Sequence, residues 1–93
     1  MLLNGAGGNR LVNNEITAQW QGVLLGSGAN ANDVIANRIS GVQGSGISLE
    51  WETSGNRVHG NRVACAEDAT WCEIIQAAPE VWEANDISGN TAW

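Results

Sequence analysis

The stretch from Asn32 to Gly55, NDVIANRISGVQGSGISLEWETSG, carries the pattern on which our interpretation of the whole chain depends. It begins with N-x-V-x-x-N-x-I and ends with the alternating segment Ile47-Ser48-Leu49. Apolar side chains at every second position predict short strands with one buried face. The alternation breaks once, at Ala36. Because small residues tolerate the backbone of a tight bend, this break predicts a bend between two strands.

The opening phrase of this stretch occurs four times along the chain. The first asparagines of the copies are 23, 24 and 29 residues apart (32 − 9, 56 − 32 and 85 − 56), and they are Asn9, Asn32, Asn56 and Asn85. A second phrase, Gly-Val/Ile-x-Leu, begins at Gly22 and Gly46 and has weaker copies at Met1–Leu3 and Trp71–Ile74. Self-similarity with such a period indicates a repeat architecture. Short strands, one bend and one longer turn per repeat predict a parallel β-solenoid of about four coils.

These phrases resemble the right-handed parallel β-helix repeat of the pectate-lyase-like families, and the resemblance covers nearly the whole chain. It implies an all-β fold, a right-handed parallel β-helix, in one domain spanning residues 1–93 that is either complete or a piece of a longer solenoid. It also implies that bend asparagines point inward and stack between coils, namely Asn14, Asn37, Asn61 and Asn90. A buried amide would satisfy backbone groups that the bend leaves unpaired. The alternative is that these asparagines are exposed turn residues.

Aligning the repeats predicts which residues stack on one another. We expect one inward column of Val23, Ile47 and Cys72, and a neighbouring column of Leu25, Leu49 and Ile74. An outward column should contain charges of alternating sign, Arg10, Asp33, Arg57 and Asp86. Each charge in that column would lie beside an opposite charge, which is favourable between neighbouring strands.

The net charge of the chain is −6, with four arginines and no lysine. Such an acidic chain is a poor partner for nucleic acids and for anionic membrane surfaces. No apolar run approaches the length of about 18 residues that a membrane span needs. The first residues also lack the basic and apolar regions of a signal peptide. We therefore expect no nucleic-acid or membrane partner and no cofactor, and the compartment stays open.

Cys65 and Cys72 are separated by six residues and both fall near expected inward positions. We favour a disulfide between them, which in the chain-entropy model would stabilise the fold by about 2–3 kcal/mol. A disulfide would favour a secreted or periplasmic location, whereas two buried thiols would be normal in a cytosolic protein. Without a suitable pair of histidines the cysteines do not form a zinc site, so no metal site is expected.

Candidate ligand-binding side chains lie in two segments. Glu50 and Glu52 flank Trp51 and would point the same way along a strand. The third repeat is longer, mainly after Ile74, and its excess predicts a loop at Gln76–Ala84. This loop adds the candidates Glu80, Trp82 and Glu83. Tryptophan faces stack on sugar rings, but the tryptophans could instead fill corners of the core or cover the coil ends, and the glutamates could form a solvated strand face.

The resemblance implies two classes of function. The first is a non-catalytic structural or binding solenoid that recognises carbohydrate, and the second is part of a polysaccharide lyase or glycoside hydrolase. Such enzymes need clustered carboxylates. The three aspartates, Asp33, Asp68 and Asp86, lie in different repeats, and the single histidine, His59, has no triad context. We therefore favour the non-catalytic module.

The two ends of the predicted solenoid show no segment that resembles a cap. Terminal coils would expose strand edges and apolar core, which invites association. We therefore expect a homo-oligomer that assembles through the coil ends, with Trp93 in the contact.

Overall fold

The computed structural model describes residues 1–3, 5, 7–18 and 20–92 of the chain, so the expected contact of Trp93 lies outside the described residues. The secondary structure consists of short strands and one short helix. Their bounds are β1 (Leu2–Leu3), β2 (Arg10–Val12), β3 (Glu15–Thr17), β4 (Gln21–Leu25), β5 (Asp33–Ile35), β6 (Arg38–Val42), β7 (Ser45–Leu49), β8 (Arg57–His59), β9 (Arg62–Cys65), β10 (Glu73–Gln76), α1 (Pro79–Ala84), β11 (Asp86–Ser88) and β12 (Thr91–Ala92).

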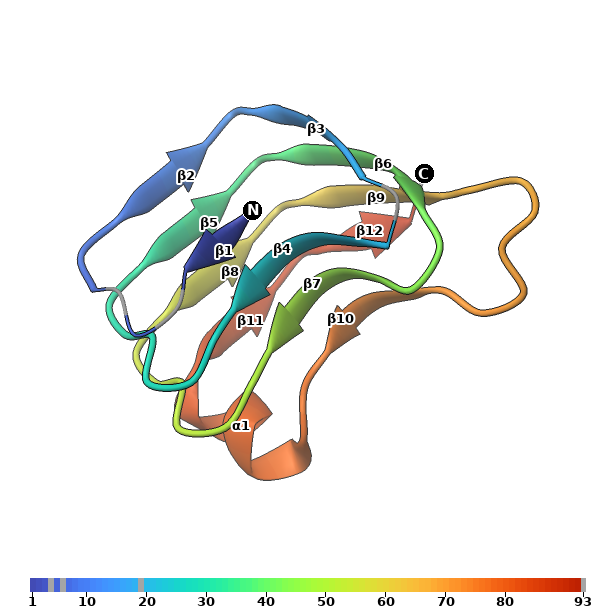
Figure 1. Ribbon diagram of the computed structural model, residues 1–93. Coiled ribbons are helices and arrows are strands. Elements are labelled where there is room, and N and C mark those ends of the chain that lie inside the picture. The colour runs from blue at the N-terminus through green and yellow to red at the C-terminus, as the bar shows by residue number, and fades with distance from the viewer. Residues whose placement is uncertain (4, 6, 19, 93) are drawn as a thin grey trace.

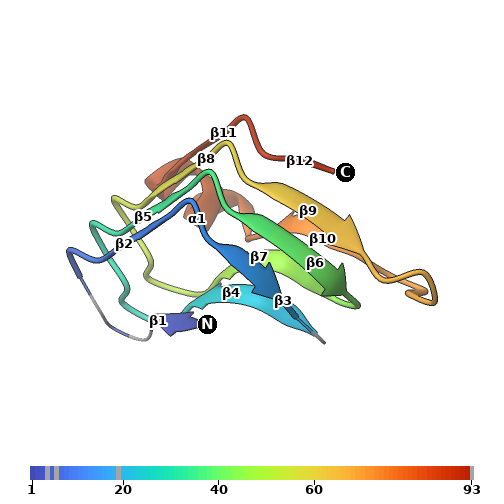
Figure 2. The same ribbon diagram turned by 90° about the horizontal axis from the view of Figure 1, so that it is seen from above.

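The strands form three sheets with the orders β1-β4-β7-β10, β11-β8-β5-β2 and β12-β9-β6-β3. The strands within each sheet pair in parallel and stack from top to bottom in Figure 1, while Figure 2 shows the three sheets arranged around the core. The structure is a β-solenoid, which confirms the predicted all-β fold. It has about three turns rather than four. The difference arises because four stacked strands are connected by only three full circuits.

The bend between the second and third strand of a coil depends on one residue with a left-handed backbone. These residues are Asn13 (φ 62°), Ala36 (φ 57°), Gly60 (φ 65°) and Gly89 (φ 69°). The next residue in every coil is an asparagine. Oδ1 of Asn37 accepts hydrogen bonds from the backbone nitrogen and Nδ2 of Asn14, at 2.9 and 3.2 Å. Asn37 donates in the same way to Oδ1 of Asn61, and Asn61 to Oδ1 of Asn90. The predicted bend asparagines thus form a ladder along the solenoid.

A second asparagine ladder, which the sequence analysis did not assign, follows the turn before β2, β5, β8 and β11. Its members are Asn9, Asn32, Asn56 and Asn85. Oδ1 of Asn56 accepts from the backbone nitrogen and Nδ2 of Asn32, at 2.9 and 3.0 Å. Oδ1 of Asn85 accepts from the same two groups of Asn56, at 3.0 and 2.8 Å. Two edges of the solenoid are therefore held by stacked side-chain amides.

The inward column at the centre of the β4-β7 sheet begins as predicted and differs in the last coil. Val23 pairs with Ile47, and Leu25 pairs with Leu49. The predicted third members, Cys72 and Ile74, are wrong, because Ile75 pairs with Ile47. Val23, Leu25 and Ile47 are fully buried, whereas Ile75 is only partly buried at the end of the stack.

The register of the last coil shifts because the inserted residues lie before β10. Val42 pairs with Cys65, and Ser45 pairs with Glu73. From the first of these paired positions to the second, the chain advances three residues in the second coil (45 − 42) and eight residues in the third (73 − 65). The insertion is therefore the loop of residues 66–72, which projects beyond the coil in Figure 1. The predicted position of the extra residues, Gln76–Ala84, is therefore wrong.

The segment predicted as a loop contains α1, which lies beside the last coil at the C-terminal end of the solenoid (Figure 1). Pro79 suits the first helical turn because its fixed φ is already helical. Val81 is buried, and its carbonyl accepts a hydrogen bond from Nδ2 of Asn85 at 2.8 Å. The helix therefore covers part of this end, where no cap was expected. The described residues include no helix that is long and apolar enough to cross a membrane.

The outward charge column has the predicted register. Arg10, Asp33, Arg57 and Asp86 occupy successive paired positions in the β11-β8-β5-β2 sheet. Oδ2 of Asp33 lies 3.5 Å from Nε of Arg10, and Oδ1 lies 3.9 Å from an Nη atom of Arg57. Both arginines are more than half exposed, so these pairs contribute at most about 1 kcal/mol each.

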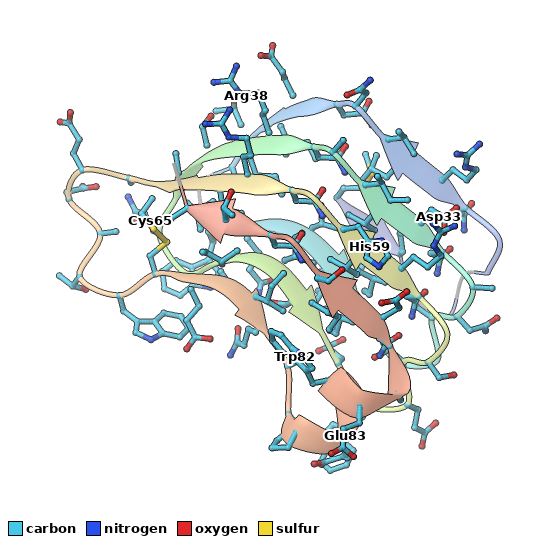
Figure 3. All side chains as sticks on the ribbon, turned by 180° about the vertical axis from the view of Figure 1, so that it is seen from behind. Asp33, Arg38, His59, Cys65, Trp82 and Glu83 are labelled. Carbon is cyan, nitrogen blue, oxygen red and sulfur yellow. A yellow bond between two sulfur atoms is a disulfide. The ribbon has the colours of Figure 1, made fainter. Side chains whose placement is uncertain are left out.

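Cys65 and Cys72 form a disulfide with a Cα–Cα distance of 6.1 Å. The bridge closes the inserted loop at its base, where β9 ends and β10 is about to begin (Figure 3). Closing a loop of this size lowers the entropy of the unfolded chain. It also holds the shifted start of β10 close to the end of β9.

Replacing Asn37 by Ala tests the asparagine ladder. The change removes the acceptor of the backbone nitrogen of Asn14 and the side-chain donor to the carbonyl oxygen of Leu11, and each buried group left without a partner costs about 1–3 kcal/mol. We expect a loss of several kcal/mol in the free energy of unfolding, measured by urea titration. Asn30 is an exposed turn asparagine, so Asn30→Ala is the matched control and should change stability little. Equal stability of the two variants would contradict this role of the ladder.

Reduction of the disulfide should lower the melting temperature, because it restores about 2–3 kcal/mol of chain entropy to the unfolded state. Calorimetry with and without reductant measures the shift. The double variant Cys65→Ser, Cys72→Ser is the control, and its melting temperature should not respond to reductant. An unchanged melting temperature of the reduced natural chain would show that the bridge does not stabilise the fold.

Candidate ligand-binding groove

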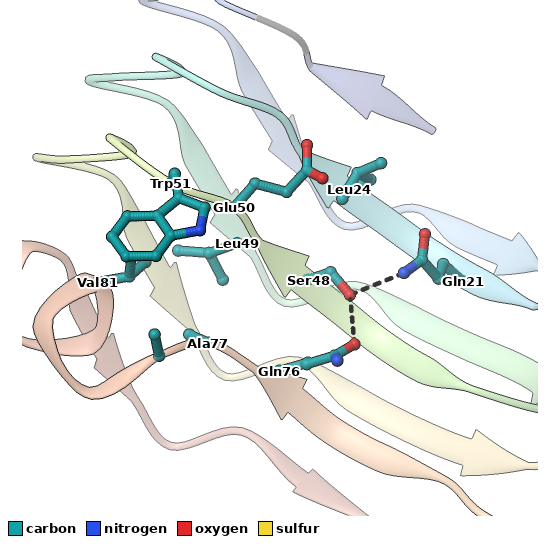
Figure 4. Close-up of a pocket in the computed structure, with 10 residues that line it drawn as sticks. Gln21, Leu24, Ser48, Leu49, Glu50, Trp51, Gln76, Ala77 and Val81 are labelled. Atoms are coloured by element: carbon teal, nitrogen blue, oxygen red, sulfur yellow. Dashed lines mark hydrogen bonds between the residues drawn. The ribbon is translucent and has the colours of Figure 1, made fainter.

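A groove with a cavity volume of ≈ 310 Å³ lies on the outer face of the β4-β7-β10 sheet (Figure 4). Its floor is formed by the outward side chains of these strands, and its other walls come from the turn after β7 and from α1. The residues that line it are Gln21, Leu24, Ser48, Leu49, Glu50, Trp51, Gln76, Ala77, Ala78 and Val81. We call it the sheet groove. Its volume is within the range of small-molecule binding sites.

A local break in strand alternation creates the polar floor. A Cβ at Gly46 would lie 2.5 Å from Cγ2 of the buried Val63, so this position faces the core and only glycine fits. The next residue, Ile47, is also buried in the core. Two successive inward positions place Ser45 and Ser48, three residues apart, on the same outer face, where their Oγ atoms are 2.6 Å apart.

The polar side chains of the floor form a network across the three strands. Nε2 of Gln21 donates to Oγ of Ser48 at 3.1 Å. Oε1 of Gln76 lies 3.1 Å from Oγ of Ser45 and 3.3 Å from Oγ of Ser48. Both serines are buried at the bottom of this network. The mutual hydrogen bonds hold the outer glutamine side chains in place, so their remaining donors and acceptors are oriented for a ligand.

The upper wall of the groove is an exposed indole. Trp51 is 68% exposed, and it lies above Val81 of α1 in Figure 4. The turn that carries it is fixed by Thr53, whose Oγ1 donates to the carbonyl oxygen of Glu50 at 2.8 Å. The backbone nitrogen of Gly28 in the preceding coil donates to the carbonyl oxygen of Trp51 at 3.4 Å. The flat apolar ring beside hydrogen-bonding side chains suits a ligand with both an apolar face and hydroxyl groups.

The structure separates the predicted ligand-binding residues. Glu50 and Trp51 line the sheet groove, but Glu52 does not. The expected strand carrying the two glutamates is wrong, because β7 ends at Leu49 and Glu52 has a left-handed backbone with φ 63°. Glu80 and Glu83 are exposed on α1 and line neither cavity that adjoins the helix, and Trp82 faces a different cavity.

The second cavity lies at the open C-terminal end of the solenoid, and we call it the end hollow. Its volume is ≈ 480 Å³, and its lining includes Ile75, Trp82, Ile87 and Asn90. Ile75 belongs to β10 and Ile87 to β11, Asn90 directly precedes β12, and Trp82 of α1 is 42% exposed. The hollow is thus the part of the core that α1 leaves uncovered.

The described residues offer little for acid–base or metal chemistry. Glu50 is the one carboxylate among the residues that line the sheet groove. His59 lies on another sheet, where its Nε2 is 3.1 Å from Oδ1 of Asp86 (Figure 3). No group of three or more His, Cys, Asp or Glu side chains in the described part of the chain is placed to hold a metal ion. The chemical groups that the groove presents are therefore an indole for stacking and side chains that form hydrogen bonds.

The sequence pattern did not predict Gln21, Ser48 and Gln76 as groove residues, nor Ser45, which is hydrogen-bonded to Ser48 and Gln76. Ser45 and Ser48 flank the repeated Gly-Ile phrase, and their partners lie one coil away. Gln76 pairs with Ser48, and this pairing depends on the corrected register of β10. In the sequence these residues are therefore separate, and nothing in the local pattern shows that they form one row.

Comparison with known proteins gives one positive result. A family model described as the right-handed beta helix region matches residues 1–92. The search among curated proteins and the search among solved structures found no match. The family match agrees with the stacked coils, and it also supplies the hand of the helix.

Proposed function

Because the chain belongs to the right-handed β-helix family, we propose that it is a non-catalytic β-solenoid module that binds carbohydrate in the sheet groove. The observation that carries this proposal is the exposed ring of Trp51 beside the hydrogen-bonded row of Gln21, Ser48 and Gln76. A sugar ring has an apolar face of CH groups and a rim of hydroxyl groups. The indole can stack on the face, and the amide groups can bond to the rim.

Two further features support a binding role. In the groove floor β4 and β7 are paired with a strand on each side and β10 is paired with β7, so the floor is formed before a ligand arrives. A preformed site loses little entropy when it binds. The disulfide favours an oxidising compartment, and secreted or periplasmic proteins commonly meet glycans there.

Replacing Trp51 by Ala tests the proposed site. The change removes the stacking surface, and we expect binding to immobilised oligosaccharides to weaken at least about tenfold, which corresponds to about 1.4 kcal/mol. A glycan array identifies ligands of the natural protein, and calorimetry compares the variants. Trp71→Ala is the matched control, because this tryptophan is also exposed but lies in the inserted loop. Glycan binding that survives Trp51→Ala, or the absence of any glycan ligand, would contradict the proposal.

The end hollow favours self-association as a second property. At this end, the last strand of each sheet has one unpaired edge, and apolar groups of Ile75, Trp82 and Ile87 line the cavity. At the opposite end Met1 and Leu2 are each 60% exposed. Burial of these surfaces against a second copy would cover the strand edges and add apolar contact area. A two-fold arrangement is the simplest, because it closes after one contact.

Light scattering tests self-association. We expect a molar mass above that of the single 9.8 kDa chain at micromolar concentration. Trp82→Ser should lower the association, because it removes apolar surface at the end hollow, and Trp71→Ser should leave the mass unchanged. A cooperative melt of a protein with the mass of one chain would contradict the prediction.

A further inference from the structure

We propose that the sheet groove selects glycans without acidic groups and that Glu50 excludes uronic acids from it. This inference rests on the carbohydrate binding proposed above and specifies the class of sugar. The positions of the charged residues on the solenoid carry it. The charged groups nearest to a ligand affect its binding most, because Coulomb interactions weaken with distance and are screened by salt.

The arginines of the chain lie on the two other sheets. Arg10 and Arg57 are on β2 and β8, and Arg38 and Arg62 are on β6 and β9. The chain has no lysine, so the outer face of the β4-β7-β10 sheet has no basic side chain. The N-terminal ammonium group lies near this sheet, where it donates a hydrogen bond to the carbonyl oxygen of Gly22 at 2.8 Å. A carboxylate ligand in the groove would therefore find no arginine or lysine partner.

Among the described residues, the one charged side chain that lines the groove is acidic. Glu50 is part of its lining, and its side chain extends toward Leu24 across the groove in Figure 4. Three further carboxylates lie on the turn and the helix that form its walls without lining it, namely Glu52, Glu80 and Glu83, whereas Glu73 lines the end hollow. The net charge of −6 adds to the local negative potential. A uronic acid would bring a second negative charge next to Glu50.

The same carboxylate favours a sugar that has only hydroxyl groups. Hydroxyl groups can donate to a carboxylate, and hydrogen bonds to a charged acceptor are stronger than those between neutral groups. Two like charges about 4 Å apart in water repel by about 1 kcal/mol, which is a factor of about five in affinity. Glu50 therefore acts as a specificity residue. It strengthens the binding of glycans that carry only hydroxyl groups and weakens the binding of glycans that carry carboxylates.

The experiment compares neutral hexose oligosaccharides with uronic acid oligosaccharides of matched length, by calorimetry or by array binding. We expect the neutral oligosaccharides to bind at least about fivefold more tightly at low ionic strength. The difference should shrink in high salt, because salt screens the repulsion. Glu50→Gln should also reduce the difference, mainly by improving the binding of the uronic acid oligosaccharides. Glu67→Gln is the control, because Glu67 is exposed in the inserted loop and does not line the groove.

The outcomes separate the two proposals. Equal or tighter binding of uronic acid oligosaccharides that Trp51→Ala abolishes would overturn the selectivity and leave carbohydrate binding in place. Discrimination that is the same in Glu50→Gln and the natural protein would overturn the role of Glu50. Failure of all oligosaccharides to bind would overturn both the proposed function and the selectivity. Circular dichroism of Glu50→Gln checks that the exposed substitution leaves the fold intact.

Discussion

The stacked asparagine amides are the interaction on which the rest of this solenoid depends. Each coil has to turn sharply at two corners, and a sharp corner leaves backbone groups inside the coil without a strand partner. In the central coils one amide accepts two hydrogen bonds from the coil before it and donates to the coil after it. The buried members, such as Asn37 and Asn56, are fully enclosed. Their loss would therefore leave several polar groups unsatisfied in the core.

The corners also fix the alignment of the sheets. Because both ladders run through every coil, a strand cannot slip along its neighbour without breaking amide contacts at its ends. The register of β5 on β8 and of β6 on β9 then follows, with Val34 opposite Val58 and Ile39 opposite Val63. The same constraint orders the outer faces. It brings opposite charges together on one sheet and a polar row under an exposed tryptophan on another.

The last coil shows where this regularity ends and where the candidate sites arise. The inserted loop of residues 66–72 moves the start of β10, and the disulfide holds the two ends of this loop together. After β10 the chain forms α1 in place of a simple turn, and this helix contributes to both cavities. Val81 closes the sheet groove and Trp82 faces the end hollow. The helix that replaces a turn in the last coil thus creates two concave surfaces on a solenoid that is regular elsewhere.

The sequence by itself determined the repeat, the strands and one asparagine ladder, because these depend on local patterns that recur at a nearly constant period. The second ladder has the same pattern in the sequence, an asparagine after a small residue, as at Gly8-Asn9, Ala31-Asn32 and Gly55-Asn56. In the structure each of these small residues has a left-handed backbone. Only the tertiary structure decided the register of β10, since the number of inserted residues on each side of a strand is set by pairing and not by local pattern. It also decided the sheet groove. Gln21, Ser48 and Gln76 are far apart in the sequence, and they become neighbours only when successive coils stack.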